Sequence, residues 1–282
     1  MLKKELAPAV ALAREAGKRI LEHSATNFCP EKKLSVDNYY EPVTIADKES
    51  SKMIVNGIAA AFPNDAILSE EETDDVERRL SADRIWIIDP LDGTAGYVKH
   101  DGDFGVQIGL VENKSPVLGV VYLPLPDKLS YATRGGGSFI IIGDGKPIKA
   151  RASSRTTLSE MTLAMSRDHK SPRMKRIIEH FGFANVVNRG SVGLKVGLIA
   201  DQTCDIYIHP SPQTKVWDTC APQLILEEAG GRFTDMYGGE LVYNRTELQN
   251  LNGILATNGA AHEAAIKHLQ PLLAEFGRVR VS

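Results

Sequence analysis

The segment Ile85–Thr94 constrains the fold of this chain more than any other stretch. It begins with four consecutive large apolar residues, which predict a short strand buried on both faces. Asp89 and Asp92 follow where the strand ends, and the proline between them cannot donate to a sheet. Gly93 permits a tight turn, and Thr94 can then begin a helix with free backbone amides. Two acids beside bare amides can hold a cation and an anion side by side. We therefore expect a metal-dependent site for a phosphorylated substrate.

Negative charge is concentrated around this segment. The net charge of −3 and the charged content of 24% are ordinary for a globular protein and give no reason to expect binding to a nucleic acid polymer or a membrane. Residues 65–103, however, hold 12 Asp and Glu against 4 Lys and Arg, which is a local charge of −8, so the rest of the chain carries +5. This stretch repels itself unless it is well solvated or binds a cation.

The length of 282 residues exceeds the usual size of a single core. A composition shift near residues 146–157 predicts two packed halves, 1–148 and 149–282. The three cysteines show no CxxC spacing and cannot all pair, which indicates free thiols in a reducing compartment. The chain begins with a charged amphipathic segment and has no apolar run near the ~18 residues of a membrane span. A cytoplasmic protein is the expectation.

The apolar pattern predicts mixed sheets with helices on their faces. In the first half the expected elements are helices at 3–22 and from about 44, strands at 66–68 and 85–88, a hairpin at 104–123, and strands at 129–133 and 137–142. We interpret 27–40 as a loop or ribbon, 74–80 as a solvated connector and the glycines at 135–137 as a turn, not a phosphate loop. In the second half strands at 162–165, 184–187, 204–208 and 254–257 alternate with helices at 171–181, 192–200, 217–229 and 260–276.

Three further acids lie at the ends or starts of predicted elements. Asp47 stands three residues after Thr44, Glu70 follows the strand at 66–68, and Asp218 begins a helix. Each has an ordinary structural explanation, namely helix capping for Asp47 and Asp218 and an acidic surface turn for Glu70. Together with the acids of the central segment, they favour a site for a hard cation such as Mg²⁺, which binds oxygen ligands.

Spacing excludes two other acidic sites. An EF-hand calcium loop needs a Glu at its twelfth position, and the twelfth residue from Asp89 is His100. A phosphatase that forms an aspartyl-phosphate is expected to show two acids two residues apart, whereas Asp89 and Asp92 are three apart.

Four segments resemble the motifs of the inositol monophosphatase superfamily, the magnesium-dependent, lithium-sensitive sugar and nucleotide phosphatases. They are Thr44–Asp47, Leu68–Glu71, Trp86–Thr94 and the span from Trp217 to Gly231, in the family's order over roughly residues 5–260. The resemblance implies an α+β fold, a layered α-β-α-β-α sandwich. Its N-terminal half would hold the metals and its C-terminal half would close over a small-molecule phosphate monoester. Homodimers are frequent in the superfamily, which leaves a homodimer open here.

The resemblance also implies the metal ligands. Glu70, Asp89 and the carbonyl of Leu91 would hold one Mg²⁺, and Asp89, Asp92 and Asp218 would hold a second, with two or three ions per site. Paired metals stabilise both the attacking and the leaving oxygen of a phosphoryl transfer, so no covalent enzyme intermediate is required.

The same resemblance assigns catalysis and phosphate binding. Asp47 and Thr94 would position and deprotonate the attacking water. The amides of Gly93 and Thr94 would bind phosphate oxygens, and Asp218 would also contact the substrate.

Within the superfamily, the chain is most similar to the CysQ-type 3'(2'),5'-bisphosphate nucleotidases. The similarity lies in the leucine of the central motif and in the segments Gly119–Tyr122, Ser166–His169 and Ser191–Lys195. In that branch the equivalents of Ser166, His169 and Lys195 lie near the nucleotide, where Lys195 would meet the second phosphate as a point charge. A solvated helix lysine and an ordinary surface histidine are the alternatives.

The resemblance therefore implies a phosphatase that removes the 3'-phosphate of adenosine 3',5'-bisphosphate. Two segments depart from the usual sequence of this branch and bear on the substrate. Ala95–Tyr97 stands where the branch usually has an acidic residue and Phe, and Ser191–Gly193 stands where it usually has Gly-Ser-Ser. An inositol monophosphatase or a sugar phosphatase like fructose-1,6-bisphosphatase is the alternative. A non-catalytic relative would require a broken catalytic set, and all of its acids and Thr94 are present.

Overall fold

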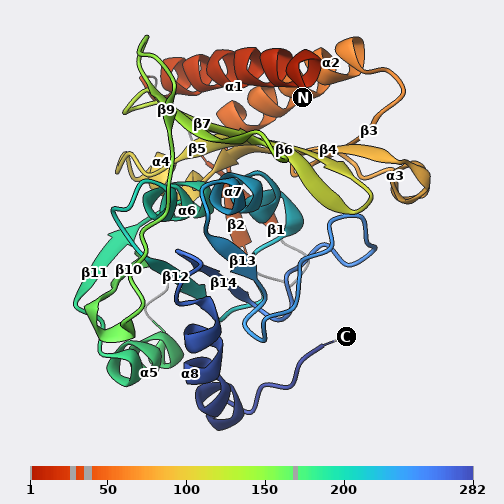
Figure 1. Cartoon of the computed structure of the whole chain (residues 1–282). Coiled ribbons are helices and arrows are strands. Elements are labelled where there is room, and N and C mark those ends of the chain that lie inside the picture. Colours follow the sequence, from red (N-terminus) through yellow and green to blue (C-terminus); the bar gives the residue numbers. More distant parts are fainter. Residues whose placement is uncertain (1, 26–29, 35–39, 168–170, 282) are drawn as a thin grey trace.

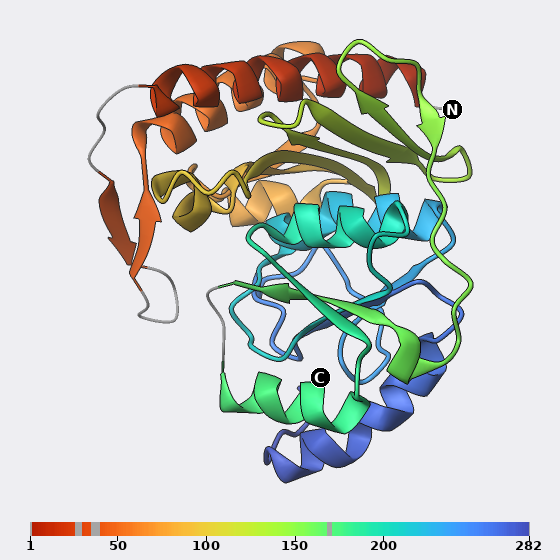
Figure 2. The same ribbon diagram turned by 90° about the vertical axis from the view of Figure 1, so that its left-hand side faces the viewer.

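Helices and sheets alternate in five layers (Figure 1, Figure 2). The computed structural model describes residues 2–25, 30–34, 40–167 and 171–281. Helices α1 (Lys3–Ser24) and α2 (Ile45–Ala61) cover the outer face of the first sheet, and α6 (Val192–Ala200) and α7 (Val216–Glu228) lie between the two sheets. Helices α5 (Pro172–Phe181) and α8 (His262–Glu275) cover the outer face of the second sheet. The structure confirms the predicted α-β-α-β-α sandwich.

Both sheets are mixed, as predicted. The strands of the first, in spatial order, are β3 (Ala66–Ser69), β4 (Arg84–Asp92), β5 (Gly105–Glu112), β6 (Ser115–Leu123), β7 (Lys128–Thr133), β8 (Gly137–Ile142) and β9 (Ile148–Lys149). Only the β3–β4 pair of this sheet is parallel. The second sheet has the order β11 (Asn185–Arg189), β10 (Thr162–Ser166), β12 (Ile206–His209), β14 (Ile254–Thr257) and β13 (Arg232–Thr234). Its β10–β11 and β10–β12 pairs are parallel, and the others are antiparallel.

Strand β4 is buried on both faces. Ile85 and Ile87 pack in a cluster with side chains of α6 and α7, whereas Trp86 and Ile88 pack in a cluster with α1 and α2. All four side chains are at most 1% exposed, and burial of four large apolar side chains contributes roughly 6–12 kcal/mol. This strand is therefore a firmly held support for the acids at its end.

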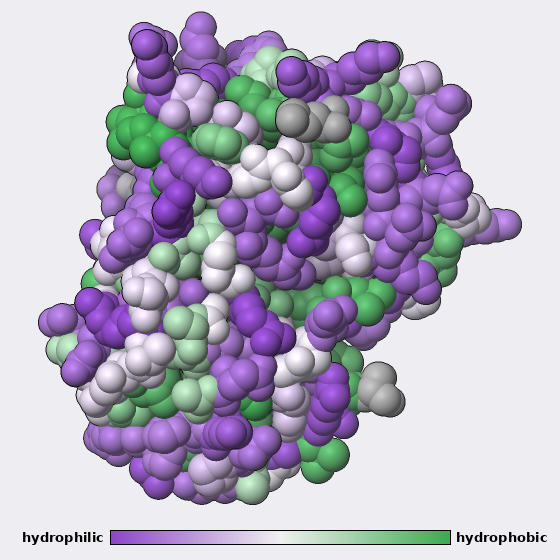
Figure 3. Space-filling view, in the orientation of Figure 1, coloured by the Kyte–Doolittle hydropathy of each residue, from purple (hydrophilic) through white to green (hydrophobic). Residues whose placement is uncertain are grey.

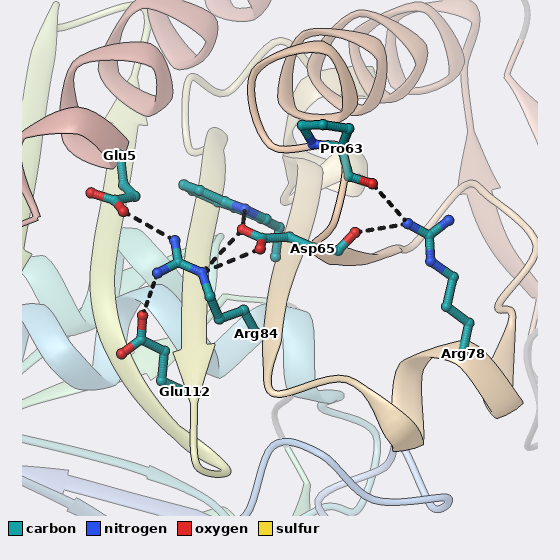
Figure 4. A network of polar contacts seen from close by, with 7 residues as sticks. Glu5, Pro63, Asp65, Arg78, Arg84 and Glu112 are labelled. Carbon is teal, nitrogen blue, oxygen red and sulfur yellow. Dashed lines mark hydrogen bonds and ion pairs between the residues drawn. The ribbon is translucent and has the colours of Figure 1, made fainter.

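Arg84 fixes the other end of β4 (Figure 4). Its guanidinium donates to Glu5 of α1 at 3.1 Å, to Asp65 before β3 at 3.2 Å and to Glu112 of β5 at 2.7 Å. The indole of Trp86 donates to the same Asp65 carboxylate at 2.9 Å. Residues from four segments thus meet at one arginine, which sets the register of β4 against its neighbours.

The structure adds detail to the sequence prediction at three segments. The predicted connector at 74–80 contains helix α3 (Val76–Ser81), whose Arg79 is only 1% exposed. The segment 27–40, predicted as a loop or ribbon, is in part an antiparallel ribbon of β1 (Glu31–Leu34) and β2 (Tyr40–Val43), while residues 26–29 and 35–39 lie outside the described residues. Strand β13, with three residues, was not predicted because it is too short to show a period.

The buried Arg79 of α3 has one partner nearby in the sequence and one that is distant. Its guanidinium donates to both oxygens of Asp74 at 2.8 Å and to the carbonyl of Arg245, 166 residues away, at 2.9 Å. These bonds neutralise a charge that would otherwise be costly to bury. The predicted connector is therefore solvated except at Arg79, through which α3 ties the first sheet to the loop before β14.

Other sequence predictions agree with the structure. The glycines at 135–137 form a turn in which the amides of Gly135 and Gly137 donate to the Glu228 carboxylate, each at 2.8 Å. Cys204 and Cys220 are free and buried, and Cys29 lies outside the described residues. Among the described helices, none is both long and apolar enough to span a membrane. Hydrophilic side chains predominate on the face shown in Figure 3, with apolar ones scattered among them.

Candidate active site

The end of β4 delivers two buried acids to a cavity of about 350 Å³. Asp89 is 1% exposed and Asp92 is 5% exposed, and the pairing with β5 shifts register between them. Pro90 lies at this irregularity, where it needs no ladder hydrogen bond. The two carboxylates can therefore face the same cavity although they are three residues apart.

Asp218 joins these two acids from α7. Single carboxylate oxygens of Asp89, Asp92 and Asp218 all lie within 4.8 Å of one another. Asp218 also accepts a hydrogen bond from the backbone amide of Lys215 at 2.5 Å, so it caps the start of α7 and contributes to the acidic cluster at once. Glu70, which follows β3, lines the same cavity, as does Leu91.

The electrostatics of this cluster favour a cation. Burial and then the neighbouring charges of Glu70, Asp92, Asp218 and Asp47 raise the pKa of the Asp89 carboxyl well above its ordinary value. A cation at the cluster would relieve this repulsion. The donors are all carboxylate or carbonyl oxygens, the ligand set of Mg²⁺ and other hard cations. The residues that the structure brings together therefore fit a divalent hard metal ion.

A second polar unit lies beside the acidic cluster and centres on Asp47. This carboxylate accepts hydrogen bonds from the amide and hydroxyl of Thr44 at 2.7 and 2.6 Å, and from the hydroxyl of Thr94 at 3.0 Å. The Thr94 hydroxyl also lies 3.0 Å from the carbonyl of Leu91. Asp47 thus caps α2, as its spacing from Thr44 predicts, and still reaches the residue at the turn after β4.

The Asp47 carboxyl is a weaker acid than an ordinary aspartate. Burial raises the pKa of the Asp47 carboxyl to about 6, although the hydrogen bonds from Thr44 and Thr94 oppose this rise. The pKa therefore lies close to neutral pH, where a carboxylate works well as a proton acceptor.

Gly93 makes the turn that presents Thr94. Its φ is +90°, and a Cβ added there would lie 2.5 Å from the carbonyl oxygen of Asp103. No other residue fits this position without displacing the backbone of the next segment. Helix α4 (Thr94–Val98) begins directly after it, and the first amides of a helix have no partner within the helix. The cavity is therefore bordered by backbone donors, as the sequence predicts.

The structure places two of the three predicted nucleotide contacts. Ser166 and Lys195 line the cavity, and His169 lies outside the described residues. Lys195 is 3% exposed, and its ammonium donates to the carbonyls of Gly190 and Ser191 at 3.0 and 2.6 Å. The alternative of a solvated helix lysine is therefore wrong. The roles of these residues stay predictions.

Sequence reasoning missed several residues of this cavity. They include two further lysines, Lys99 at the end of α4 and Lys215 at the start of α7. The ammonium of Lys215 lies 5.7 Å from the ring centre of Trp217. Its position two residues before the Trp217–Asp218 motif was the available signal.

A second cavity adjoins the first. It has a volume of about 590 Å³ and shares Ser166, His209 and Gln213 with the acidic cavity. Apolar side chains such as Met165 and Ile208 line it. A ligand with its phosphate at the acidic cluster can therefore extend into a larger and more apolar space.

Comparison with known proteins agrees with this geometry. Residues 1–274 match the model of the inositol monophosphatase family. The chain is 32% identical over 236 residues to the 3'(2'),5'-bisphosphate nucleotidase CysQ of Escherichia coli K12, covering 84% of this chain and 92% of that protein. It is 30% identical over 257 residues to the inositol-1-monophosphatase of Bacillus subtilis, covering 89% and 90%.

Solved structures show the same likeness. An IMPase of Thermotoga maritima superposes with a TM-score of 0.81 at 27% identity, covering 96% of this chain and 99% of that one. CysQ of Bacteroides thetaiotaomicron superposes with a TM-score of 0.74 at 29% identity, covering 90% and 96%.

Proposed function

The chain belongs to the inositol monophosphatase family of phosphatases, and from this premise we propose that it is a Mg²⁺-dependent nucleotidase that converts adenosine 3',5'-bisphosphate to AMP and phosphate. One observation carries the proposal: four acids and three lysines border a single cavity. The acids are Glu70, Asp89, Asp92 and Asp218, and the lysines are Lys99, Lys195 and Lys215. Such a cavity suits metal ions together with a highly charged anion.

Charge balance favours a substrate with two phosphates. The expected pair of Mg²⁺ ions would neutralise the four acids, and the three lysines border the same cavity as these acids. One phosphate monoester carries about −1.5 to −2 at neutral pH, so a nucleoside bisphosphate carries about −3 to −4. Three lysine charges match the bisphosphate better than the monophosphate. The adjoining 590 Å³ cavity would accept the nucleoside.

The residues of the chain then have definite tasks. Bound Mg²⁺ would supply a lowered pKa for the attacking water and charge neutralisation at the phosphate. The Thr94 hydroxyl donates to Asp47, so its oxygen is free to accept a hydrogen bond from that water. Asp47 takes the proton through Thr94, and the amides of Gly93 and Thr94 bind the phosphate oxygens that gain charge.

A side-by-side assay tests the substrate. Phosphate release is measured with adenosine 3',5'-bisphosphate, inositol 1-phosphate and fructose 1,6-bisphosphate, each with Mg²⁺ and with EDTA. We expect activity only with Mg²⁺ and the highest kcat/KM for the nucleotide. A preference for either sugar phosphate would refute the nucleotidase and support the alternative of an inositol monophosphatase or sugar phosphatase, which the Bacillus subtilis relative represents.

A lysine variant sharpens this test. Lys215→Met should raise KM for adenosine 3',5'-bisphosphate by roughly 10-fold to 100-fold, because a charged contact is lost. The KM for adenosine 3'-monophosphate, which lacks the second phosphate, should change far less. Lys175→Met is the matched control, since that lysine is 81% exposed on α5. Equal effects on both nucleotides would remove Lys215 from recognition of the second phosphate.

We also propose a cytoplasmic location, a homodimer, two or three metal ions per site, and a division of the chain into the halves 1–148 and 149–282.

A further inference from the structure

The carboxylate of Asp92 has more hydrogen-bond partners than a metal ligand needs. Its Oδ2 atom accepts from the side-chain amide of Gln107 at 2.6 Å, from the hydroxyl of Ser191 at 2.5 Å and from the amide of Gly193 at 2.7 Å. Its Oδ1 atom accepts from the amide of Val192 at 3.0 Å. A carboxylate offers about two acceptor sites on each oxygen, so Oδ2 is filled and Oδ1 keeps a site for a cation.

Gln107 lies within the first sheet, where a buried side-chain amide is less favourable for stability than an apolar side chain. It is 0% exposed and stands directly opposite Asp89 in the β4–β5 ladder. Its Nε2 atom serves Asp92, while its Oε1 atom is buried without a hydrogen-bond donor among the described residues. A buried acceptor without a partner is destabilising, and an apolar side chain would avoid that cost. What the amide contributes is therefore the orientation of Asp92.

Ser191 reaches Asp92 from the second half in a strained conformation. Its φ is +50° although it carries a side chain, a conformation that glycine adopts more readily. The same hydroxyl that donates to Asp92 accepts from the amide of Leu194 and caps α6. Gly193 allows this close approach, because a Cβ there would lie 3.2 Å from Gln107 and 3.3 Å from Asp92.

We infer that Gln107 and Ser191 are positioning residues of the metal centre, which hold Oδ2 of Asp92 from β5 and from the start of α6 and leave Oδ1 for the cation. In this role each residue acts through Asp92. The inference rests on the metal site of the proposed function but is independent of the substrate. Residues that orient a metal ligand in this way typically change metal affinity by about 10-fold to 100-fold when they are replaced.

Metal binding without substrate tests the inference. The metal-free full chain is titrated with Mn²⁺, whose free fraction is read from its electron paramagnetic resonance signal, and with Mg²⁺ by calorimetry. Gln107→Leu and Ser191→Gly should each bind both ions about 10-fold to 100-fold more weakly than the wild type. Gln223→Leu is the matched control, because Gln223 is also a buried glutamine with hydrogen bonds to Glu227 and Tyr243. It should bind the ions as the wild type does.

Thermal unfolding separates positioning from folding. Ser191→Gly relieves the positive φ, so its unfolding temperature should stay near that of the wild type while its metal affinity falls. This variant decides the matter alone if Gln107→Leu does not fold. Wild-type metal affinity in Ser191→Gly and in any folded Gln107→Leu would overturn the inference and leave the proposed function intact. A wild-type protein that binds neither ion would overturn both.

Discussion

Replacement of Asp47 by asparagine should stabilise the metal-free protein at pH 8 while it removes phosphatase activity. Burial raises the pKa of the Asp47 carboxyl from 3.8 to about 6. The folded protein therefore holds this proton more tightly than the unfolded chain does. The stability that the group contributes is fully present below pH 3.8 and is lost as the pH rises through about 6.

The size of the effect follows from this shift. A difference of about 2 pKa units corresponds to about 3 kcal/mol, which the ionised carboxylate costs the folded state at pH 8. Asparagine removes the charge and keeps one acceptor for the Thr44 amide, which donates to Asp47 at 2.7 Å. Since about 1 kcal/mol of hydrogen bonding is lost, the net gain should be roughly 2 kcal/mol.

Urea unfolding in EDTA at pH 5 and pH 8 measures this gain. The part that arises from the charge should be about half as large at pH 5 as at pH 8. Asp75→Asn is the control, because Asp75 caps α3 by accepting from the Arg78 amide at 3.1 Å and lies on the surface. Asparagine caps equally well, so this variant should change stability by less than about 0.5 kcal/mol.

Activity supplies the other half of the prediction. Loss of a general base should lower kcat of Asp47→Asn by about 10²-fold to 10⁴-fold. If the variant unfolds at the same or a lower urea concentration than the wild type at pH 8, burial does not destabilise the carboxylate and the reasoning fails. If the variant keeps full activity, Asp47 is not the proton acceptor.

Two further predictions concern stability away from the site. Burial lowers the pKa of His262 to about 4 from 6.5, so stability present above pH 6.5 should be lost as the pH falls through about 4. Wild type should lose about 3 kcal/mol more than His262→Gln between pH 7.5 and pH 3.5 in urea unfolding, and equal losses would contradict this. Arg79→Leu leaves Asp74 without its arginine and cuts the bond to the Arg245 carbonyl, so unfolding should be about 3 kcal/mol easier. The neighbouring exposed Arg78→Leu is the control, and a matching loss there would contradict a special role for Arg79.

Local pattern was enough to predict the centre of the fold. The apolar run at the start of β4, the acids at its end and the capping position of Asp47 are short-range features, and the structure shows each of them. The ends of amphipathic helices such as α1 were also predicted to within a few residues. In each case the residues that determine the element lie close to one another in the sequence.

What the sequence could not show depends on partners that are distant along the chain. Arg79 looked solvated because its partner at Arg245 lies 166 residues away. Lys195 had two interpretations because only the position of α6 between the two sheets determines its burial. Gln107 went unnoticed because a single polar residue in a strand has no pattern, and its contact with Asp92 became visible only with the β4–β5 register.

The acidic stretch at 65–103 shows how the chain divides its charge between structure and chemistry. Four of its acids are paired with arginines: Asp65 with Arg84, Asp74 with Arg79, and both Asp101 and Asp103 with Arg167. The two pairs with Arg167 join the halves of the chain, and none of the four acids needs a metal ion for charge compensation.

The inner acids are arranged differently. Asp89 and Asp92 lie with Asp218 within 4.8 Å, and their mutual repulsion contributes to the raised pKa of Asp89. An arginine there would satisfy the fold but would fill the cavity, whereas a small cation neutralises the same charge and leaves coordination positions for water and phosphate. Arginines therefore compensate the predicted self-repulsion at the rim of this stretch. At its centre the repulsion between the carboxylates is retained, and it favours the binding of a metal ion there.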